Sequence, residues 1–485
     1  MLQVFAFIVI TSLFFKAIID VDLSYDSWWY HLPFAARIWR IVPPELFLGD
    51  EKWFVPRFEG FPLLAHFLQG FFWLVSGRIQ TANLVSFLSL IIYLFFLKTN
   101  FQVPLYLSAI ALLAIPLVLT HTTSSLVDLP GSMGFSILLA IAYKLFKQKQ
   151  LPKKQELLIA VLAAATAANV KTHLQPLVLA TVCIVVVRLG WLCFSQTKIL
   201  GKQLFKFVPI GILAFLLIFA TPIKNIILYG NPLYPIKIEV VGIVLNHKLA
   251  PEVSERGNRG QKWLRSILEI KSAPWSTEQG SSEPERNRMG GFFGAYVVFN
   301  LLLLLGLSIY ELLLKDTQLL EARTALVMVV MMSLITAYFP QSHELRYVMF
   351  WMILLVSLNL YLISRPIHMT EWLQPKYMGL VYAIFLTFVL STIHGIYTKP
   401  SFQSLEQQIL KGVKPELLSQ IGAGDRVCLI SRHVEFPQQV PMAAMQYVFL
   451  YSSYFHPEIN YSYSVKAAFN PKSCGERRIL PIQER

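Results

Sequence analysis

The chain has 485 residues, of which 55% are hydrophobic and 14% are charged, and its formal net charge is +14. A soluble globular chain carries about 25% charged residues, so this composition excludes an ordinary soluble domain. The apolar residues lie in runs long enough to cross a bilayer as helix, which takes about 20 residues. We therefore predict an all-α polytopic membrane protein, because only helices and closed barrels satisfy their backbone in lipid and no barrel-like alternation is visible.

Apolar runs predict about eleven transmembrane helices. In chain order they lie near residues 2–20, 81–98, 103–120, 130–147, 156–170, 173–193, 206–221, 291–314, 323–339, 345–363 and 377–396. The first run has no basic start and no small-residue cleavage site, so we interpret it as a retained helix and not as a signal peptide. The stretch 61–76, FPLLAHFLQGFFWLVS, is short and carries His66 and Gln69. It predicts a helix that lies in the membrane interface and does not span.

The distribution of basic residues predicts the orientation. With the N-terminus inside, every short cluster of basic residues falls on the cytoplasmic side. These residues are Lys98, Lys144, Lys147, Lys149, Lys153, Lys154, Lys198, Lys202, Lys206, Lys315, Arg323, Arg365 and Lys376. If 61–76 spanned the membrane, the lysine cluster of 144–154 would move outside. Loops that hold the orientation also explain the net charge, and no nucleic-acid motif is visible.

The same topology predicts two domains. Residues 1–396 form the transmembrane core, with outer loops at 21–80 and 222–290. The polar tail, 397–485, contains the strand-like RVCLIS and is expected to form a small extracytoplasmic α/β domain, or only to cap the membrane part. Cys428 and Cys474 of the tail would meet oxidising conditions there, but spacing alone does not show that they pair.

The first outer loop opens with charged and aromatic residues. SYDSWWYHLPFAARIW begins at Ser24 and brings Asp26 and His31, with Asp22 just before it, to the mouth of the first helix. Its apolar residues recur at roughly helical spacing, which predicts an amphipathic helix on the membrane surface with Asp26 at its N-terminus. The alternative is that Asp26 is only an N-cap that satisfies free backbone amides.

Further polar side chains are predicted on the same side. They are Glu59 in RFEGFP, Asp128 in HTTSSLVDLPGS, Lys171 in NVKTHLQP, Asn231 in YGNPLYP, and His343, Glu344 and Arg346 in PQSHELRY. The alternatives are structural: a helix cap for Asp128, a Glu344–Arg346 salt bridge, and a rigid turn at Asn231. A carboxylate is a suitable general base for a hydroxyl nucleophile, and cations stabilise a departing phosphate. The set therefore suits transfer from a lipid phosphate.

These stretches, in this order and on this side, resemble the GT-C superfamily of integral-membrane glycosyltransferases over roughly residues 1–396. YDSWWYHLPFAARIW is similar to an aspartate-containing DS..YHLP stretch of a bacterial branch, and FEGFPLLAHFLQGFFWLVSG to the segment that follows it. SSLVDLP resembles the second outer acidic site, and GNPLYP and HELRY resemble recurrent features of the branch. The resemblance implies a bacterial inner membrane, a polyprenyl-phosphate-linked sugar donor and inverting transfer on the outer face.

The resemblance also implies roles for single residues. Asp26 matches the catalytic base, with Asp22 as its close competitor, Asp128 matches the second acidic position, and Arg346 lies where a donor phosphate is expected. The substrate-binding set is Asp22, His31, Glu59, Lys171, Asn231, His343, Glu344 and Arg346. The acceptor hydroxyl belongs to a glycan, a lipid or a protein. No cofactor is expected, and a divalent metal shared by Asp26 and Asp128 is the alternative.

Two other classes of function stay open at this point. One is a transporter or flippase for lipid-linked saccharides, and the other is an inactive scaffold of the same fold. Transporters often show internal repeats and broken helices near the midplane. No repeat is visible here, and the polar residues gather at one face, which favours an enzyme.

Overall fold

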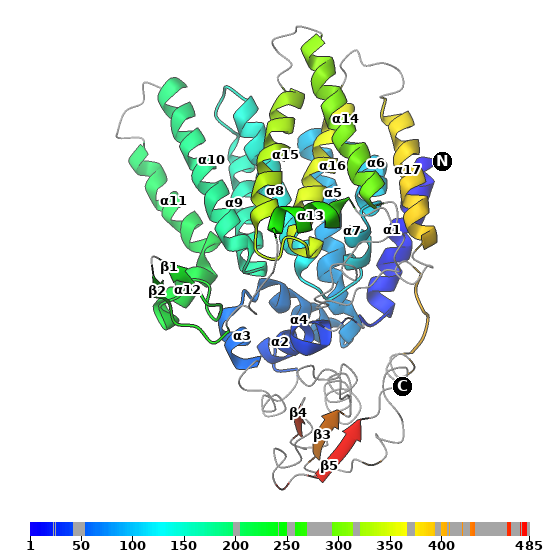
Figure 1. Ribbon diagram of the computed structural model, residues 1–485, viewed down its shortest axis with the longest axis vertical. Helices are drawn as coiled ribbons and strands as arrows, with labels where there is room; N and C mark the ends of the chain where they lie inside the picture. The colour runs from blue at the N-terminus through cyan, green and yellow to red at the C-terminus, as the bar shows by residue number, and fades with distance from the viewer. Residues whose placement is uncertain are drawn as a thin grey trace.

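A computed structural model of the chain is shown in Figure 1. The structure describes residues 1–22, 24, 26–41, 54–196, 204–240, 242–249, 258–268, 293–313, 321–365, 374–392, 399–404, 407, 420, 427–431, 463–466, 476 and 478–482. Within these residues the chain is mostly helical, and its strands are few and short.

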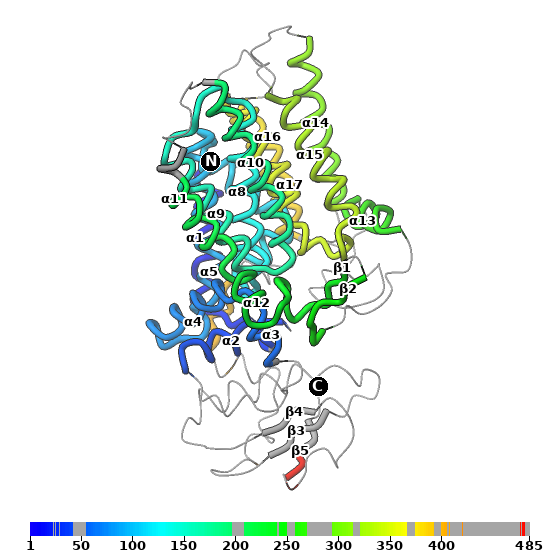
Figure 2. Tube along the Cα trace, turned by 90° about the vertical axis from the view of Figure 1, so that its left-hand side faces the viewer, coloured from blue at the N-terminus to red at the C-terminus, as the bar shows by residue number. Residues whose placement is uncertain are grey.

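Helices that run side by side form the main body of the molecule (Figures 1 and 2). The longer ones are α1 (Leu2–Ile19), α5 (Leu84–Phe101), α8 (Asp128–Lys147), α9 (Lys154–Val170), α10 (Leu174–Gln196), α11 (Leu204–Ile218), α14 (Phe293–Leu313), α15 (Glu321–Tyr338), α16 (Met349–Ile363) and α17 (Pro375–Thr392). Shorter helices are α6 (Leu105–Leu113), α7 (Pro116–His121) and α12 (Ala220–Tyr229).

Seven helices of the described part are long and apolar enough to cross a membrane, or eight if the bent pair α11–α12 forms one span. In the apolar 18-residue window of α8, 89% of the residues are buried, against 22% in the corresponding windows of α1 and α10, so α8 is central and the other two are peripheral. Peripheral helices expose large apolar side chains such as Phe7, Val187 and Leu313. Contiguous apolar surface of this extent needs lipid as its solvent. The chain is therefore a membrane-embedded helical protein.

Seven of the predicted runs coincide with these helices. Residues 103–120 are divided between the short helices α6 and α7, and 156–170 form α9, which has 17 residues. Residues 206–221 enter the pair that bends by 72° at Phe219, and 377–396 fall in the shorter apolar helix α17. The total of eleven spans therefore stays a prediction.

Short helices lie across one end of the bundle (Figure 1). They are the π-helix η1 (Ser27–His31), α2 (Leu32–Ile38), α3 (Phe54–Gly60), α4 (Leu64–Ser76) and the 3-10 helix η3 (Ile79–Asn83). The stretch expected in the interface forms α4, whose 13 residues reach about 20 Å, less than the roughly 30 Å of a hydrocarbon core. A Cβ at Gly70 would lie 2.5 Å from the Ala35 carbonyl oxygen, so glycine permits the close packing of α4 on α2.

The two ends of the bundle differ in charge. α1 starts at the end opposite the crosswise helices (Figure 1), and α8 reaches that end with Lys144 and Lys147 in its last turn. The α8 lysines and the crosswise helices therefore lie at opposite ends of the bundle, and the prediction that the lysine-rich end is cytoplasmic stays a prediction. Arg78, at the crosswise end, follows the C-terminus of α4.

The loop after α12 packs against α3. Gly230 ends α12 with φ of 69°, a left-handed conformation that favours glycine, as the tight turn of YGNPLYP predicts. The Asn225 amide donates to the Gly60 carbonyl oxygen at 2.8 Å and to the Tyr234 carbonyl oxygen at 3.2 Å. The loop continues through the antiparallel pair β1 (Glu239–Val240) and β2 (Ile243–Val244) to α13 (Arg259–Ile267). Figure 2 shows α13 beside α15.

The described part of the tail holds a three-stranded parallel sheet of order β4-β3-β5. β3 (Val427–Ser431) pairs with β4 (Tyr463–Lys466) and with β5 (Arg478–Ile482). The strand expected at RVCLIS is therefore confirmed as β3. The α/β domain at 397–485, its side of the membrane and its boundary with 1–396 stay predictions, and Cys474 of the expected disulfide lies outside the described residues.

Candidate functional site

Asp26 lies directly before η1, at the end of the bundle where the crosswise helices lie. Its carboxylate makes no capping hydrogen bond to that helix. Instead, Oδ2 accepts a hydrogen bond from Nη1 of Arg346 at 2.7 Å, and the two side chains are 10% and 14% exposed. The N-cap alternative therefore does not describe Asp26. Its carboxylate is the partner of a largely buried cation 320 positions further along the chain.

Arg346 occupies the 3-10 helix η4 (Leu345–Val348), which leads directly into α16. The guanidinium uses its three nitrogens on three partners: Asp26, Oε2 of Glu344 at 3.3 Å, and the Tyr347 hydroxyl at 3.0 Å. The expected Glu344–Arg346 salt bridge is present, but it is one branch of a larger cluster. His343 lies just before this cluster and is partly buried.

A second ion pair joins Asp128 to Lys171. Asp128 is the first residue of α8, Lys171 follows α9, and the lysine Nζ lies 3.0 Å from Oδ1 of the aspartate. The Asp128 side chain is fully buried and caps no helix, and its Oδ2 has no partner within the described residues. A buried carboxylate oxygen without a partner is costly unless a further donor reaches it.

Tyr347 connects the two ion pairs. Its ring centroid is 4.7 Å from the Arg346 guanidinium carbon and 5.5 Å from Nζ of Lys171. The His173 ring packs against the same tyrosine, with 5.0 Å between centroids. Both cations thus lie against the same aromatic ring, which places Asp26, Arg346, Lys171 and Asp128 in a single cluster.

A histidine pair lies beside this cluster. Nδ1 of His31 and Nε2 of His66 are 2.8 Å apart, and the rings stack with 5.1 Å between centroids. Nε2 of His31 and Nδ1 of His66 are buried and have no hydrogen-bond partner in the described part of the chain. Burial lowers the pKa of His66 to about 3, and burial followed by the neighbouring His66 lowers the pKa of His31 well below its ordinary value. Both rings are therefore neutral near pH 7.

Tyr30 keeps its proton in the same surroundings. Burial, and then the negative charge of Asp26, raise the pKa of its hydroxyl well above the ordinary value. Its ring lies against His31, with 4.1 Å between centroids. A neutral phenol beside Asp26 is a hydrogen-bond donor for a substrate oxygen.

Asp22 has a different environment. Its carboxylate accepts hydrogen bonds from the Ser24 amide and hydroxyl at 2.9 Å, from the Ser27 hydroxyl, and from the Ser125 amide at 2.8 Å. The Ser125 carbonyl oxygen in turn accepts from Gln69 at 2.6 Å. Asp22 therefore ties the first outer loop to the turn before α8, which orients the segment that carries Asp26.

Glu59 and Asn231 contribute to the outer loops. Glu59 is exposed, and its carbonyl oxygen accepts a hydrogen bond from Lys224. Asn231 is fully buried, donates to the carbonyl oxygens of Ile236 and Asn246 at 2.9 and 2.7 Å, and accepts from the Leu233 amide at 2.9 Å. Through these bonds Asn231 holds the backbone of the loop in a rigid turn. Its expected contact with substrate stays a prediction.

Metal-ligating side chains are not grouped in the described residues. No three His, Cys, Asp or Glu side chains there lie in an arrangement that could hold a metal ion. Asp26 and Asp128, the two carboxylates considered for a shared metal, each face a cation instead.

Sequence reasoning missed Tyr347 and His66 as members of the site. Tyr347 follows Arg346 in HELRY, so adjacency to a site cation was its available signal. His66 stands out only as a titratable residue in an apolar stretch. Its partner, His31, lies 35 positions earlier, and no spacing rule predicts that pairing.

The fold and this cluster define a membrane-embedded helical protein with a buried, charged site at one end of its bundle. The chain belongs to the family described as "Domain of unknown function (DUF8201)", whose model matches residues 60–353, more than half of the chain. The match includes Asp128, Lys171 and Arg346, and Asp26 precedes it. No curated protein and no solved structure matches the chain.

Proposed function

We propose that the protein transfers a sugar from a polyprenyl-phosphate-linked donor to a hydroxyl acceptor on the extracytoplasmic face of a bacterial inner membrane. The observation that carries the proposal is the largely buried pair of Asp26 and Arg346 at the mouth of α16, 2.7 Å apart. It supports the proposal because a carboxylate is suited to act as a general base and a guanidinium is suited to bind phosphate. The resemblance to the GT-C superfamily adds the donor class and the inverting outcome.

Arg346 is the proposed partner of the donor phosphate. Its planar fork of donors matches a phosphate, and three of its donors already point to oxygen atoms. A phosphate at this place takes over the hydrogen bond that Asp26 now accepts. The ion pair then becomes a phosphate–arginine pair, and the Asp26 carboxylate turns to the acceptor hydroxyl.

The proposed reaction is a single displacement. Asp26 takes the proton of the acceptor hydroxyl, and the oxygen forms a bond to the anomeric carbon as the bond from that carbon to the phosphate oxygen breaks. The lipid phosphate leaves with the electron pair, and Arg346 balances its charge. The Tyr30 hydroxyl, held in its protonated form, is suited to donate to a sugar oxygen.

Asp128 and Lys171 form the proposed sugar-binding side of the site. Oδ2 of the carboxylate has no partner within the described residues, and a sugar hydroxyl is a donor that would satisfy it. The unpartnered ring nitrogens of His31 and His66 are available in the same region. Because both rings are neutral, each can donate or accept through one nitrogen.

A transporter of lipid-linked saccharides is the second candidate, and one observation favours it. α11 and α12 form a pair that bends by 72°, and transporters often contain broken spans. Figure 1 places α12 near the crosswise helices, at the end of the bundle, whereas transporters bind substrate near the midplane. The charged cluster lies at that same end, which supports the transferase. An inactive scaffold is the third reading, and it gives no role to the Oδ2 atom of Asp128, which has no partner within the described residues.

The test is a transfer assay on the full chain in lipid nanodiscs. A panel of radiolabelled polyprenyl-phosphate sugars is incubated with protein and crude cell-envelope acceptor. The proposal expects label in an acceptor fraction and an equal amount of released polyprenyl phosphate. Movement of intact donor across a liposome membrane, with no released lipid phosphate, would replace the transferase by the transporter.

A further inference from the structure

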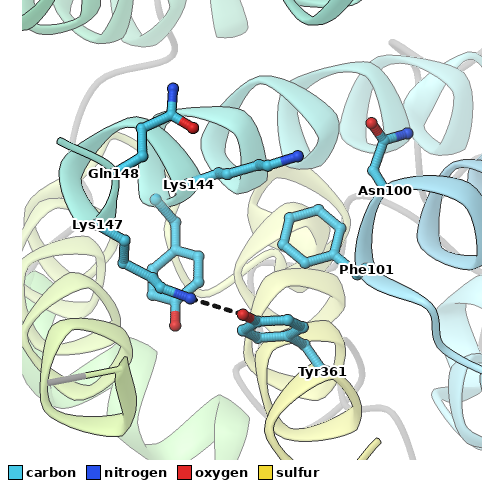
Figure 3. A pocket seen from close by; sticks show the side chains of 7 residues that line it. Asn100, Phe101, Lys144, Lys147, Gln148 and Tyr361 are labelled. Atoms are coloured by element: carbon cyan, nitrogen blue, oxygen red, sulfur yellow. Dashed lines mark hydrogen bonds between the residues drawn. The ribbon is translucent and has the colours of Figure 1, made fainter. Parts of the chain in front are cut away.

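A second polar pocket lies at the other end of the bundle. It has a volume of about 200 Å³ and is lined by the ends of three helices: α5 with Asn100 and Phe101, α8 with Tyr143, Lys144, Lys147 and Gln148, and α16 with Tyr361 (Figure 3). α8 begins at Asp128 in the candidate site and ends at Lys147. Its 20 residues span about 30 Å, so the pocket is separate from that site.

The polar groups that α8 contributes to the pocket are donors of hydrogen bonds. Lys144 and Lys147 carry ammonium groups, which donate and never accept. Nε2 of Gln148 is buried and has no acceptor within the described residues. Figure 3 shows Phe101 and the Tyr361 ring facing the same space. Donors above an apolar wall suit an anionic group that is attached to an apolar body.

The existing partners of the two lysines leave room for a ligand. Lys144 Nζ lies 2.6 Å from Glu156, and Lys147 donates to the Tyr361 hydroxyl at 2.6 Å and pairs with Glu321. An ammonium has three donors, so each lysine keeps at least one for another oxygen. Glu321 also pairs with Arg365, and a shift of Lys147 toward a ligand therefore leaves no carboxylate without a cation.

The C-terminus of a helix normally repels an anion, because its free carbonyl oxygens carry partial negative charge. Here Arg188 of α10 covers those oxygens. It donates to the carbonyl oxygens of Leu145 at 3.2 Å, Phe146 at 3.4 Å and Gln148 at 3.1 Å. The negative end of α8 is thus neutralised by a cation that does not line the pocket.

We propose that this pocket binds a phosphate group, and that the phosphate is the headgroup of an anionic membrane lipid. Basic pockets between spans at the cytoplasmic side are known sites for such headgroups. Drug-sized ligands occupy roughly 300–1,000 Å³, so this smaller space suits a headgroup alone. The acyl chains stay in the bilayer. The proposal is independent of any reaction at Asp26.

The experiment uses the purified full chain in a neutral detergent. Dioleoylphosphatidylglycerol and dioleoylphosphatidylcholine are titrated separately, and bound lipid is counted by native mass spectrometry. We expect the anionic lipid to bind at least tenfold more tightly than the zwitterionic one. Lys144→Gln should weaken the anionic lipid about tenfold, the effect of losing one charge-assisted hydrogen bond. The matched control is Lys98→Gln, an exposed lysine in the last turn of α5, for which we expect less than a twofold change.

A further variant and a further ligand keep the test decisive. Gln148→Glu retains both lysines and adds a negative charge to the pocket, so it should weaken the anionic lipid even if Lys144→Gln does not fold. Equal losses in Lys98→Gln and Lys144→Gln would overturn the pocket as the site. Inorganic phosphate is titrated alone as a further ligand. If it binds as tightly as the anionic lipid, the proposal of a lipid headgroup is overturned and the ligand is a soluble phosphate.

Discussion

The two ends of the bundle both bury ion pairs, but their carboxylates differ in how far they are satisfied. At the lysine-rich end, Glu321 forms ion pairs with Lys147 and Arg365 and accepts a hydrogen bond from the Tyr361 hydroxyl. Both carboxylate oxygens of Glu311 accept a hydrogen bond from the Ala322 amide. At the other end, Asp128 is fully buried, its Oδ1 lies 3.0 Å from Nζ of Lys171, and its Oδ2 has no partner within the described residues.

This difference separates a structural cluster from a candidate site. A buried ion pair is compensated only when further hydrogen bonds satisfy its remaining atoms. Glu321 meets that condition with groups of its own chain. Oδ2 of Asp128 and one ring nitrogen of each histidine in the His31–His66 pair do not, and these atoms belong to the end that holds Asp26 and Arg346. Each such atom in a packed core needs a further partner, and a substrate that supplies it is consistent with a candidate site.

The comparison predicts its largest effect at Asp26. Asp26→Asn should reduce sugar transfer by roughly 10²–10⁴-fold, the usual contribution of a general base, because an amide cannot accept the hydroxyl proton. Initial rates are measured at saturating donor, with the melting temperature as the check on folding. Transfer within threefold of the parent would return Asp26 to a structural ion pair.

Glu321→Gln should show the opposite pattern. Removing this carboxylate leaves Lys147 and Arg365 without their buried partner and should lower the free energy of unfolding by about 3 kcal/mol, the lower end of the range for breaking such a pair, since both cations are partly exposed. Transfer per folded molecule should stay within twofold. Chemical unfolding in detergent gives the first quantity, and a loss of transfer with intact folding would contradict the distinction between the two ends.

Acid should weaken the candidate-site end through its histidines. The pKa of His66 is about 3 in the folded state, and the ordinary value is about 6.5, so the unfolded chain binds more protons between these two values. Stability is therefore complete above pH 6.5 and falls with decreasing pH, by up to about 1.4 kcal/mol per pH unit.

Melting temperatures between pH 7 and pH 4 measure this dependence. His66→Gln should flatten the decline, whereas His247→Gln, a partly exposed histidine of the outer loop, should leave it unchanged. Parallel curves for the parent and His66→Gln would show that the buried histidine pair does not cause the loss of stability in acid.

The smallest effect is expected at Asp22. Asp22→Asn keeps one acceptor oxygen for the Ser24 and Ser27 hydroxyls and the Ser125 amide, which Oδ2 now accepts, and loses the acceptor of the Ser24 amide. It should therefore lower transfer by less than tenfold. A pH–rate profile distinguishes its role. A positioning residue leaves the profile unmoved, and a shift of its acid limb would make Asp22, and not Asp26, the base.

Sequence patterns predicted much of the framework. Run lengths predicted the membrane helices, and the short run at 61–76 predicted a helix of less than spanning length. Loop position alone assigned Asp26, Asp128, Lys171 and Arg346 to one side, and the structure brings them together around Tyr347.

Pairings across the bundle were not predictable in the same way. Asp26 and Arg346 are 320 positions apart, and Asp22 reaches the Ser125 amide over 103 positions. Such partners depend on which helices pack together. The periodicity of a helix shows which of its faces is buried, but not which other helix that face contacts. Asn231 illustrates the reverse, because its neighbouring Gly230 and Pro232 indicated a turn, and its amide indeed holds that loop.

The most direct test of the account measures binding and turnover on one pair of variants. Polyprenyl phosphate without sugar is titrated into the parent, Asp26→Asn and Arg346→Gln, and transfer is assayed on the same preparations. The account predicts that Asp26→Asn binds the lipid phosphate at least as tightly as the parent and does not turn over, because Arg346 is released from its carboxylate. Arg346→Gln should lose both. Equal lipid-phosphate affinity in all three proteins would contradict the assignment of the Asp26–Arg346 pair as the reaction centre.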